Sequence, residues 1–179
     1  MFPARYRGLL IALSVMVLLF GIGGYFGFRT SSEEPREAVM AFDSTAVVLI
    51  EFTDHSDQAN NFQLARIDGD WERAGDRSFT VDPERQASRL LEQFHFLPVK
   101  RDMGMIGLVG ERFGLAPEKM AQITFVQGDG LSHTLNLGSS TFATGKVGAW
   151  TYVNVPNEKI VYAVEGLLTA ELRPGSDSL

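Results

Sequence analysis

The segment from Gly8 to Phe28 is the feature that most constrains the fold of this chain, because it is almost wholly apolar. Tyr25 carries its only ionisable side chain. A helix rises about 1.5 Å per residue and the hydrocarbon core of a bilayer is about 30 Å thick, so about 20 apolar residues can span it. The segment therefore predicts a transmembrane helix, in which the backbone groups satisfy one another inside the lipid.

The charges beside this helix predict its orientation. Arg5 and Arg7 precede it, whereas Arg29 is soon followed by the acidic pair Glu33 and Glu34. Basic flanks tend to remain in the cytoplasm. We therefore predict a single-pass protein of the inner (cytoplasmic) membrane, whose C-terminal domain lies in the periplasm or an equivalent extracytoplasmic space.

A cleaved secretory signal is the alternative interpretation of the same segment, since it shares the basic start and the apolar middle. Two features favour a retained anchor. The apolar run exceeds the usual signal core of about 7 to 15 residues, and Gly-Phe-Arg-Thr at positions 27 to 30 is a poor cleavage site. The chain has no cysteine, which excludes disulfides and a lipid-modified N-terminal cysteine.

The part of the chain beyond the anchor is acidic. The formal charge of the whole chain is -6, and the first 29 residues contribute +3 through three arginines, so the remainder carries -9. An acidic surface without clustered lysines and arginines argues against nucleic acid as a partner, and against binding to anionic lipids through a basic patch.

The predicted organisation is one domain behind a short tether. We expect a cytoplasmic start and transmembrane helix over 1–29, a linker over 30–41, a domain over 42–173 and a flexible tail over 174–179. About 150 residues beyond the anchor are enough for one domain with its own core.

Both halves of the domain, 42–98 and 118–173, are predicted to run as strands followed by a helix. In the first half, alternation predicts strands over 46–52 and 62–67, a turn at Asp68-Gly69 and a return strand from Trp71. Asp82-Pro83 is a good helix start, and an apolar stripe continues that helix to about Leu97.

The second half repeats this plan. Strands are expected over 120–126, 131–137, 150–155 and 160–163, with a loop over 138–148 and a closing helix over 165–172. This order predicts an α+β fold of antiparallel hairpins and sheets with helices packed on one face. A duplicated unit with two similar halves is one origin of the pattern; the similarity is of pattern and not of residues.

The middle segment from Val99 to Val109 is apolar, contains glycines and shows no clear period. An ordinary core crossover and an adaptable patch that docks on a membrane partner or dips into the membrane interface both account for it. The loop over 139–148 has the composition of a recognition tip, with a plain surface loop as the alternative. The candidate partner-contact residues are Met103, Met105, Ile106, Leu108, Phe142 and Lys146.

No pattern of catalytic or metal-binding residues stands out. His55, His95 and His133 lie far apart without a zinc-binding spacing, and the glycines at 104, 107 and 110 lack the Gly-Lys-Ser/Thr ending of a phosphate loop. Asp54 and Asp57 flank His55, where a polar turn is favoured over an acid-base pair. We therefore expect no catalytic residues, cofactor or metal.

Three groups of residues carry a resemblance: Asp68 to Trp71, Phe113 to Pro117, and Trp150 to Val155 followed by Lys159 to Tyr162. They resemble the G-x-W hairpin, the Y-G-L-x-x-P-like break and the late V-Y strand of a bacterial domain-of-unknown-function family whose members follow an N-terminal membrane helix. The resemblance covers residues 42–173. Phe113 replaces the usual Tyr, and Ala116 stands where an acidic residue is common.

Related domains occur in auxiliary subunits of ABC-type transport systems, including those linked to gliding motility. The resemblance therefore implies a membrane or periplasmic protein partner, and it implies no catalytic residues. Its structural markers are Trp71, Gly114, Pro117, Trp150 and Tyr162. The leading hypothesis is a non-enzymatic, membrane-anchored accessory protein. The alternative is a periplasmic enzyme or small-ligand binder that uses a cleft between the two halves.

Overall fold

The computed structural model describes residues 36–74, 81–142 and 148–172. The predicted transmembrane segment, the tail after residue 173 and the candidate contact residue Lys146 lie outside these ranges. Within them, no helix combines the length and apolar character needed to cross a membrane. The folded unit begins at Glu37.

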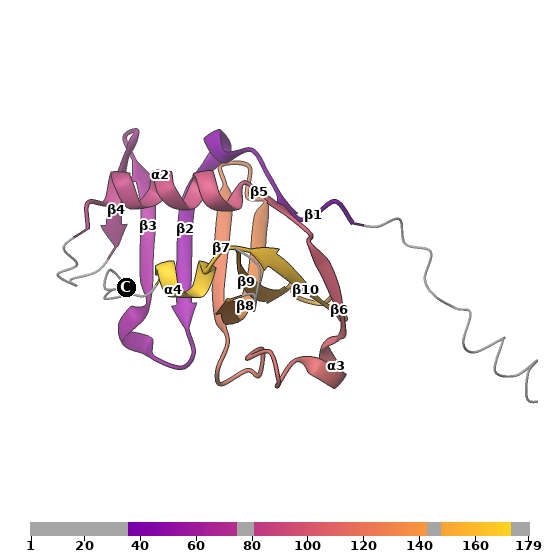
Figure 1. Cartoon of the computed structure of the whole chain (residues 1–179). Coiled ribbons are helices and arrows are strands. Elements are labelled where there is room, and N and C mark those ends of the chain that lie inside the picture. The colour runs from indigo at the N-terminus through magenta and orange to yellow at the C-terminus, as the bar shows by residue number, and fades with distance from the viewer. Residues whose placement is uncertain (1–35, 75–80, 143–147, 173–179) are drawn as a thin grey trace, which may run out of the picture. The chain divides into compact units, whose positions relative to one another are not determined.

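An antiparallel sheet of eight strands forms the centre of this unit, in the order β4-β3-β2-β7-β8-β9-β10-β6 (Figure 1). The strands are β2 (Val47–Asp54), β3 (Phe62–Ile67), β4 (Asp70–Ala74), β6 (Arg101–Met105), β7 (Ala121–Gln127), β8 (Ser132–Phe142), β9 (Ala149–Asn154) and β10 (Ile160–Glu165). The predicted halves meet where β2 pairs with β7, so they contribute to one continuous sheet. The prediction of antiparallel hairpins is confirmed.

Two further strands form a small separate sheet. β1 (Ala38–Ala41) pairs with β5 (Phe96–Pro98), and Met40 lies opposite Leu97. β1 occupies the last four residues of the segment predicted as a linker. These residues join the fold because Val39 and Met40 are buried in the core.

The helices within the described residues are few and short. They are α2 (Pro83–Phe94), α3 (Ile106–Val109) and α4 (Leu168–Leu172), with single 3-10 turns η2 (Ser44–Ala46) and η3 (Gln58–Asn60). α2 begins as predicted, since the Asp82 side chain accepts a hydrogen bond from the backbone N–H of Arg85 at 3.3 Å. The predicted end at Leu97 is wrong, because Pro98 disfavours a helical Leu97 and that residue instead lies in β5.

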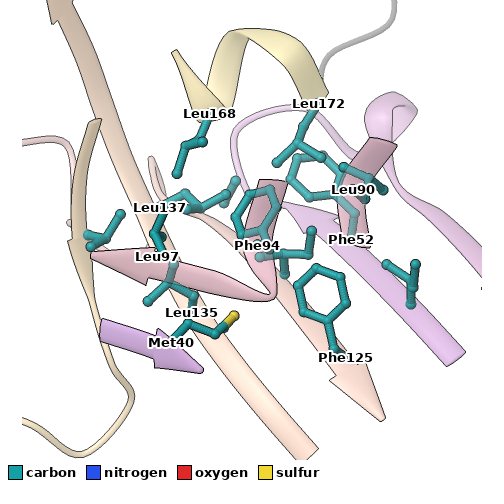
Figure 2. Packing of buried hydrophobic residues seen from close by; sticks show 14 of the residues in the cluster. Met40, Phe52, Leu90, Phe94, Leu97, Phe125, Leu135, Leu137, Leu168 and Leu172 are labelled. Carbon is teal, nitrogen blue, oxygen red and sulfur yellow. The ribbon is translucent and has the colours of Figure 1, made fainter. Parts of the chain in front are cut away.

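The main core lies between one face of the sheet and the two longer helices. Figure 2 shows side chains from β2, β7 and β8 pointing toward those of α2, α4, β1 and β5. Its labelled members are Met40, Phe52, Leu90, Phe94, Leu97, Phe125, Leu135, Leu137, Leu168 and Leu172. Full burial of one such side chain stabilises a fold by about 1.5–3 kcal/mol. The domain is thus a mostly antiparallel β structure with two short helices on a shared core.

Two other predicted boundaries are wrong. The loop predicted from residue 138 is strand, because β8 continues to Phe142 after an irregularity between Leu137 and Ser140. The helix predicted from Glu165 starts at Leu168, because β10 includes Glu165 and Gly166 then adopts φ of +106°. That left-handed conformation, which glycine adopts most easily, separates the strand from α4.

Candidate interaction site

The segment from β6 through α3 contains four of the six candidate contact residues. β6 is the last strand of the large sheet and pairs only with β10 among the strands described here. Its register shifts around Met103, and the following Gly104 has φ of +104°. The Asp102 carboxylate accepts a hydrogen bond from the Gly104 N–H at 2.7 Å. β6 is therefore a bulged edge strand.

Both edges of the sheet carry features that discourage another strand from adding to them. At β6 these are the bulge and the acceptor on Asp102. At β4, the backbone N–H of Trp71 donates to the Glu84 carboxylate of α2 at 3.1 Å. Natural proteins use bulges, charges and covering elements to prevent edge-to-edge pairing. Recognition by this domain is therefore better served by side chains than by strand addition.

α3 is held firmly at the end of β6. The backbone N–H of Ile106 donates to the Lys159 carbonyl at 2.7 Å, and the Gly110 N–H donates to the Ile106 carbonyl at 2.8 Å. Ile106 and Val109 pack against a second buried cluster formed by Phe113, Leu115 and Val161. The inner side of α3 is thus anchored in the domain.

The second cluster lies on the face of the sheet opposite the main core. Tyr152 and Val161 belong to it, whereas their neighbours Val153 and Tyr162 belong to the main core. Successive residues of a strand point to opposite faces, which places the two clusters on the two sides of the sheet. The rings of Phe113 and Tyr152 stack at 4.1 Å.

Glycines allow the segment after α3 to lie directly on β8. The Ser139 N–H donates to the Phe113 carbonyl at 2.8 Å. A Cβ on Gly138 would lie 2.2 Å from that carbonyl oxygen, and a Cβ on Gly114 would lie 2.3 Å from Ser139 Oγ. Gly114 also has φ of +72°, a left-handed conformation that glycine adopts most easily.

The outer side of α3 exposes large apolar side chains. Leu108 is 83% exposed and Met105 is 56% exposed. Met103 and Ile106 differ from them, since both are partly buried against the second cluster. The side of the segment with Met103 and Ile106 packs in the domain, as a core crossover would. The side with Met105 and Leu108 is exposed, as a patch would be.

Phe142 does not join this surface. It is 68% exposed, and it pairs with Ala149, whose carbonyl accepts from the Gly166 N–H. Met105 pairs instead with Ile160 of β10. Ile160 precedes Gly166 by six residues along the chain. At about 3.3 Å per residue, the two exposed apolar points are about 20 Å apart along the strands.

The remaining structural markers differ in burial. Trp71 and Tyr162 are buried, and the Tyr162 hydroxyl donates to the Glu158 carboxylate at 3.4 Å. Trp150 is half-buried in β9, and Pro117 is exposed in the turn that precedes β7.

The acidic residues around His55 form a structured loop, as the polar-turn interpretation predicted. Asp54 is fully buried. Its carboxylate accepts hydrogen bonds from the Ser56 hydroxyl at 2.6 Å and from the Asn60 amide at 2.9 Å. The described parts of the chain contain no group of three histidine, aspartate or glutamate residues placed to hold a metal ion.

Sequence reasoning overlooked a set of polar pairs on the sheet face opposite the main core. Gln63 donates to Glu51 at 2.6 Å, Gln122 donates to Asn136 at 3.0 Å, and the hydroxyls of Thr124 and Thr134 lie 3.0 Å apart. The available signal was the alternation of polar with apolar residues in part of each strand, at Glu51 and Thr53 in β2 and at Gln122 and Thr124 in β7.

The pKa is shifted at Asp43 and at Arg73 among the described residues. Hydrogen bonds from the Thr45 hydroxyl and N–H lower the pKa of the Asp43 carboxyl. Partial burial lowers the pKa of Arg73, whose guanidinium lies 5.7 Å from the centre of the Phe62 ring. Neither group belongs to the β6–α3 segment.

Comparison with protein-family models, with curated proteins and with solved structures finds no significant match to this chain. The family resemblance indicated by the sequence motifs therefore stays a prediction.

Proposed function

We propose that this protein is a membrane-anchored, non-enzymatic accessory protein, whose extracytoplasmic domain contacts other components of the cell envelope. The observation that carries the proposal is the set of large apolar side chains exposed at two ends of the sheet, Leu108 at 83%, Phe142 at 68% and Met105 at 56% exposure. Exposed apolar residues on an otherwise charged, acidic domain are candidate contact sites for a partner. Phe142 adds a second exposed apolar point about 20 Å away.

The rigidity of α3 supports a recognition role. Its inner residues Ile106 and Val109 pack on the second cluster, and its first N–H donates to the carbonyl of Lys159, the residue before β10. Leu108 is therefore held in place before any partner arrives. Such preorganisation reduces the conformational entropy lost on binding.

The predicted anchor supports the same role. A helix over 8–28 would confine the domain to a membrane surface, which raises its effective concentration toward any component of that membrane. The sequence motifs resemble domains in auxiliary subunits of ABC-type transport systems. We therefore place the protein partner among the transport or envelope complexes of the same membrane, with the Phe142 end of the sheet as its contact.

Site-specific photocrosslinking in cells tests this proposal with the full-length chain. A photoreactive phenylalanine analogue at 142, and in a second strain at the neighbouring exposed Thr141, is expected to capture the same envelope protein. Leu131, which is 54% exposed on the hairpin between β7 and β8, provides the matched control position.

The outcome that contradicts the proposal is a set of adducts at 141 and 142 that matches the set at 131. Membrane topology gives an independent check. The chain has no native cysteine, so an impermeant maleimide reports on single cysteines placed at 131 or 142. Labelling is expected from outside the cytoplasmic membrane, and labelling only after lysis would contradict the predicted orientation.

A further inference from the structure

We infer that the exposed side of α3 inserts into the lipid surface from which the predicted anchor emerges. This inference rests on the proposed function, because it names the partner of the α3 end of the domain. It leaves the Phe142 end for the protein partner.

The length of the tether permits this contact. The chain enters the fold beside β5, where the Val99 N–H donates to the Glu37 carbonyl at 3.0 Å, and β6 starts two residues later. The five residues of β6 and the four of α3 together extend about 20–25 Å from this entry point. The residues between the predicted helix and Glu37, 29 to 36, span up to about 28 Å when extended. α3 therefore lies within reach of the surface.

The chemistry of the segment suits shallow insertion. Residues 105 to 110 are Met-Ile-Gly-Leu-Val-Gly, which includes no charged side chain. Leu108 and Met105 are exposed on it, while the charged side chains lie outside this run, at Arg101, Asp102, Glu111 and Arg112. Apolar side chains that enter the boundary between head groups and acyl chains are a known mode of attachment.

The composition of the exposed surface favours lipid over a protein as the occupant. Residues 105 to 110 offer no charged or hydrogen-bonding side chain, whereas a protein interface carries about one hydrogen bond per 100–200 Å². The exposed hydroxyl of Thr141 beside Phe142 can supply such a bond. A domain that is already tethered needs only weak additional contacts to become oriented, because its effective concentration at the surface is high. The acidic charge of the domain also indicates that the contact is apolar and does not depend on anionic lipid.

Depth-dependent quenching in nanodiscs tests the inference with the full-length chain. Because the chain has no cysteine, Leu108→Cys and Phe142→Cys each accept a single environment-sensitive NBD label. In phosphatidylcholine nanodiscs that contain nitroxide-labelled phosphatidylcholine, NBD at 108 is expected to shift to shorter wavelength and lose emission. NBD at 142 is expected to do neither. High salt should leave both signals unchanged, and Met105→Asp should reduce the quenching at 108.

Equal quenching at 108 and 142, or no quenching at 108, would overturn the inference. The inference would also fail if photocrosslinking at 108 in cells captured a protein and the NBD label at 108 were not quenched. That result would identify a protein as the occupant and leave the accessory function intact.

Quenching at 108 without specific adducts at 141 or 142 would support the lipid contact and contradict the proposed protein partner. The two proposals can therefore fail separately. Leu108 is 83% exposed, so its replacement leaves the core intact.

Discussion

The two faces of the eight-stranded sheet differ in the polarity of their side chains and in what covers them. One face is covered by α2, α4 and the β1–β5 pair, and its side chains form the large apolar core. The other face carries hydrogen-bonded polar pairs and is apolar mainly where the segment after α3 crosses it. The comparison indicates that the first face supplies most of the stability. The second face supports the exposed elements through which we propose that the domain makes its contacts.

The largest expected effect comes from the covered face. Phe125 is fully buried, and its ring lies 4.9 Å from Phe42 and 5.6 Å from Phe94. Phe125→Ala is expected to lower the free energy of unfolding by about 3–5 kcal/mol, because it leaves a cavity as well as removing buried apolar surface. Urea denaturation followed by circular dichroism measures this loss. The exposed control Leu131→Ala should stay within about 0.5 kcal/mol of wild type.

A smaller effect is expected from the second cluster. Leu115 is buried there, beneath α3, in a cluster with far fewer members than the main core. We expect Leu115→Ala to cost about 2–3 kcal/mol, near the lower end for such a truncation, since a small cluster relaxes more easily. Hydrogen exchange should show faster exchange at residues 106–115 than in β2 and β7. A cost as large as that of Phe125→Ala would contradict the difference between the faces.

A matched pair of glycines tests the close approach between the segment after α3 and β8. Gly114→Ala and Gly69→Ala both place a side chain at positive φ, but only at 114 would the new Cβ meet Ser139, at 2.3 Å from Oγ and 2.9 Å from N. The strain alone costs about 1 kcal/mol, expected at Gly69. Gly114→Ala should cost about 1–2 kcal/mol more, since backbone must shift. Equal changes in Tm for the two variants would show that the approach is not tight.

The polar pairs of the second face should contribute little. Thr124 and Thr134 are half-buried and their hydroxyls lie 3.0 Å apart. Replacing both by valine keeps the shape and removes both polar groups, which can be nearly neutral, so we expect a change within about 0.5 kcal/mol. Thermal denaturation of Thr124→Val, Thr134→Val and the double variant measures this change. A loss comparable to that of Leu115→Ala would overturn the distinction between polar and apolar regions of this face.

The smallest expected effect is a pH dependence at the border of the covered face. Asp43 follows Phe42, whose ring packs on Phe125. Hydrogen bonds from Thr45 lower the pKa of the Asp43 carboxyl. A carboxyl with a lowered pKa in the folded state stabilises that state above its unfolded pKa of about 4 and loses this contribution as pH falls through the lowered value. Asp43→Asn should therefore show a slightly weaker acid sensitivity than wild type below about pH 4. Identical acid-unfolding profiles would contradict the role of Asp43.

Local chemistry was enough to predict several elements. β3 matches its predicted bounds, and α2 starts where Asp82 and Pro83 place it. The turn at Asp68-Gly69 has positive φ at both residues. In each case the determining interactions lie within a few residues of one another, so the pattern is visible along the chain.

Elements that depend on distant partners could not be predicted in this way. β6 has neither alternation nor β-branched residues, and its position is set by pairing with β10. The sequence places β1 in the linker, because the burial of this strand depends on β5, more than 50 residues later in the chain. The candidate contact residues were chosen by composition, which cannot separate the packed side of α3 from its exposed side.

The sequence by itself determined the antiparallel strands, the start of α2, the acidic balance and the apolar segment over 8–28, because each follows from residue types at short spacing. Only the tertiary structure decided that α3 exposes Leu108 while partly burying Ile106 and Val109 against the second cluster, and that Phe142 lies far from it. The physical reason is that exposure depends on what packs from elsewhere in the chain. Here the packing comes from Phe113, Leu115 and β10, which no local pattern around α3 specifies.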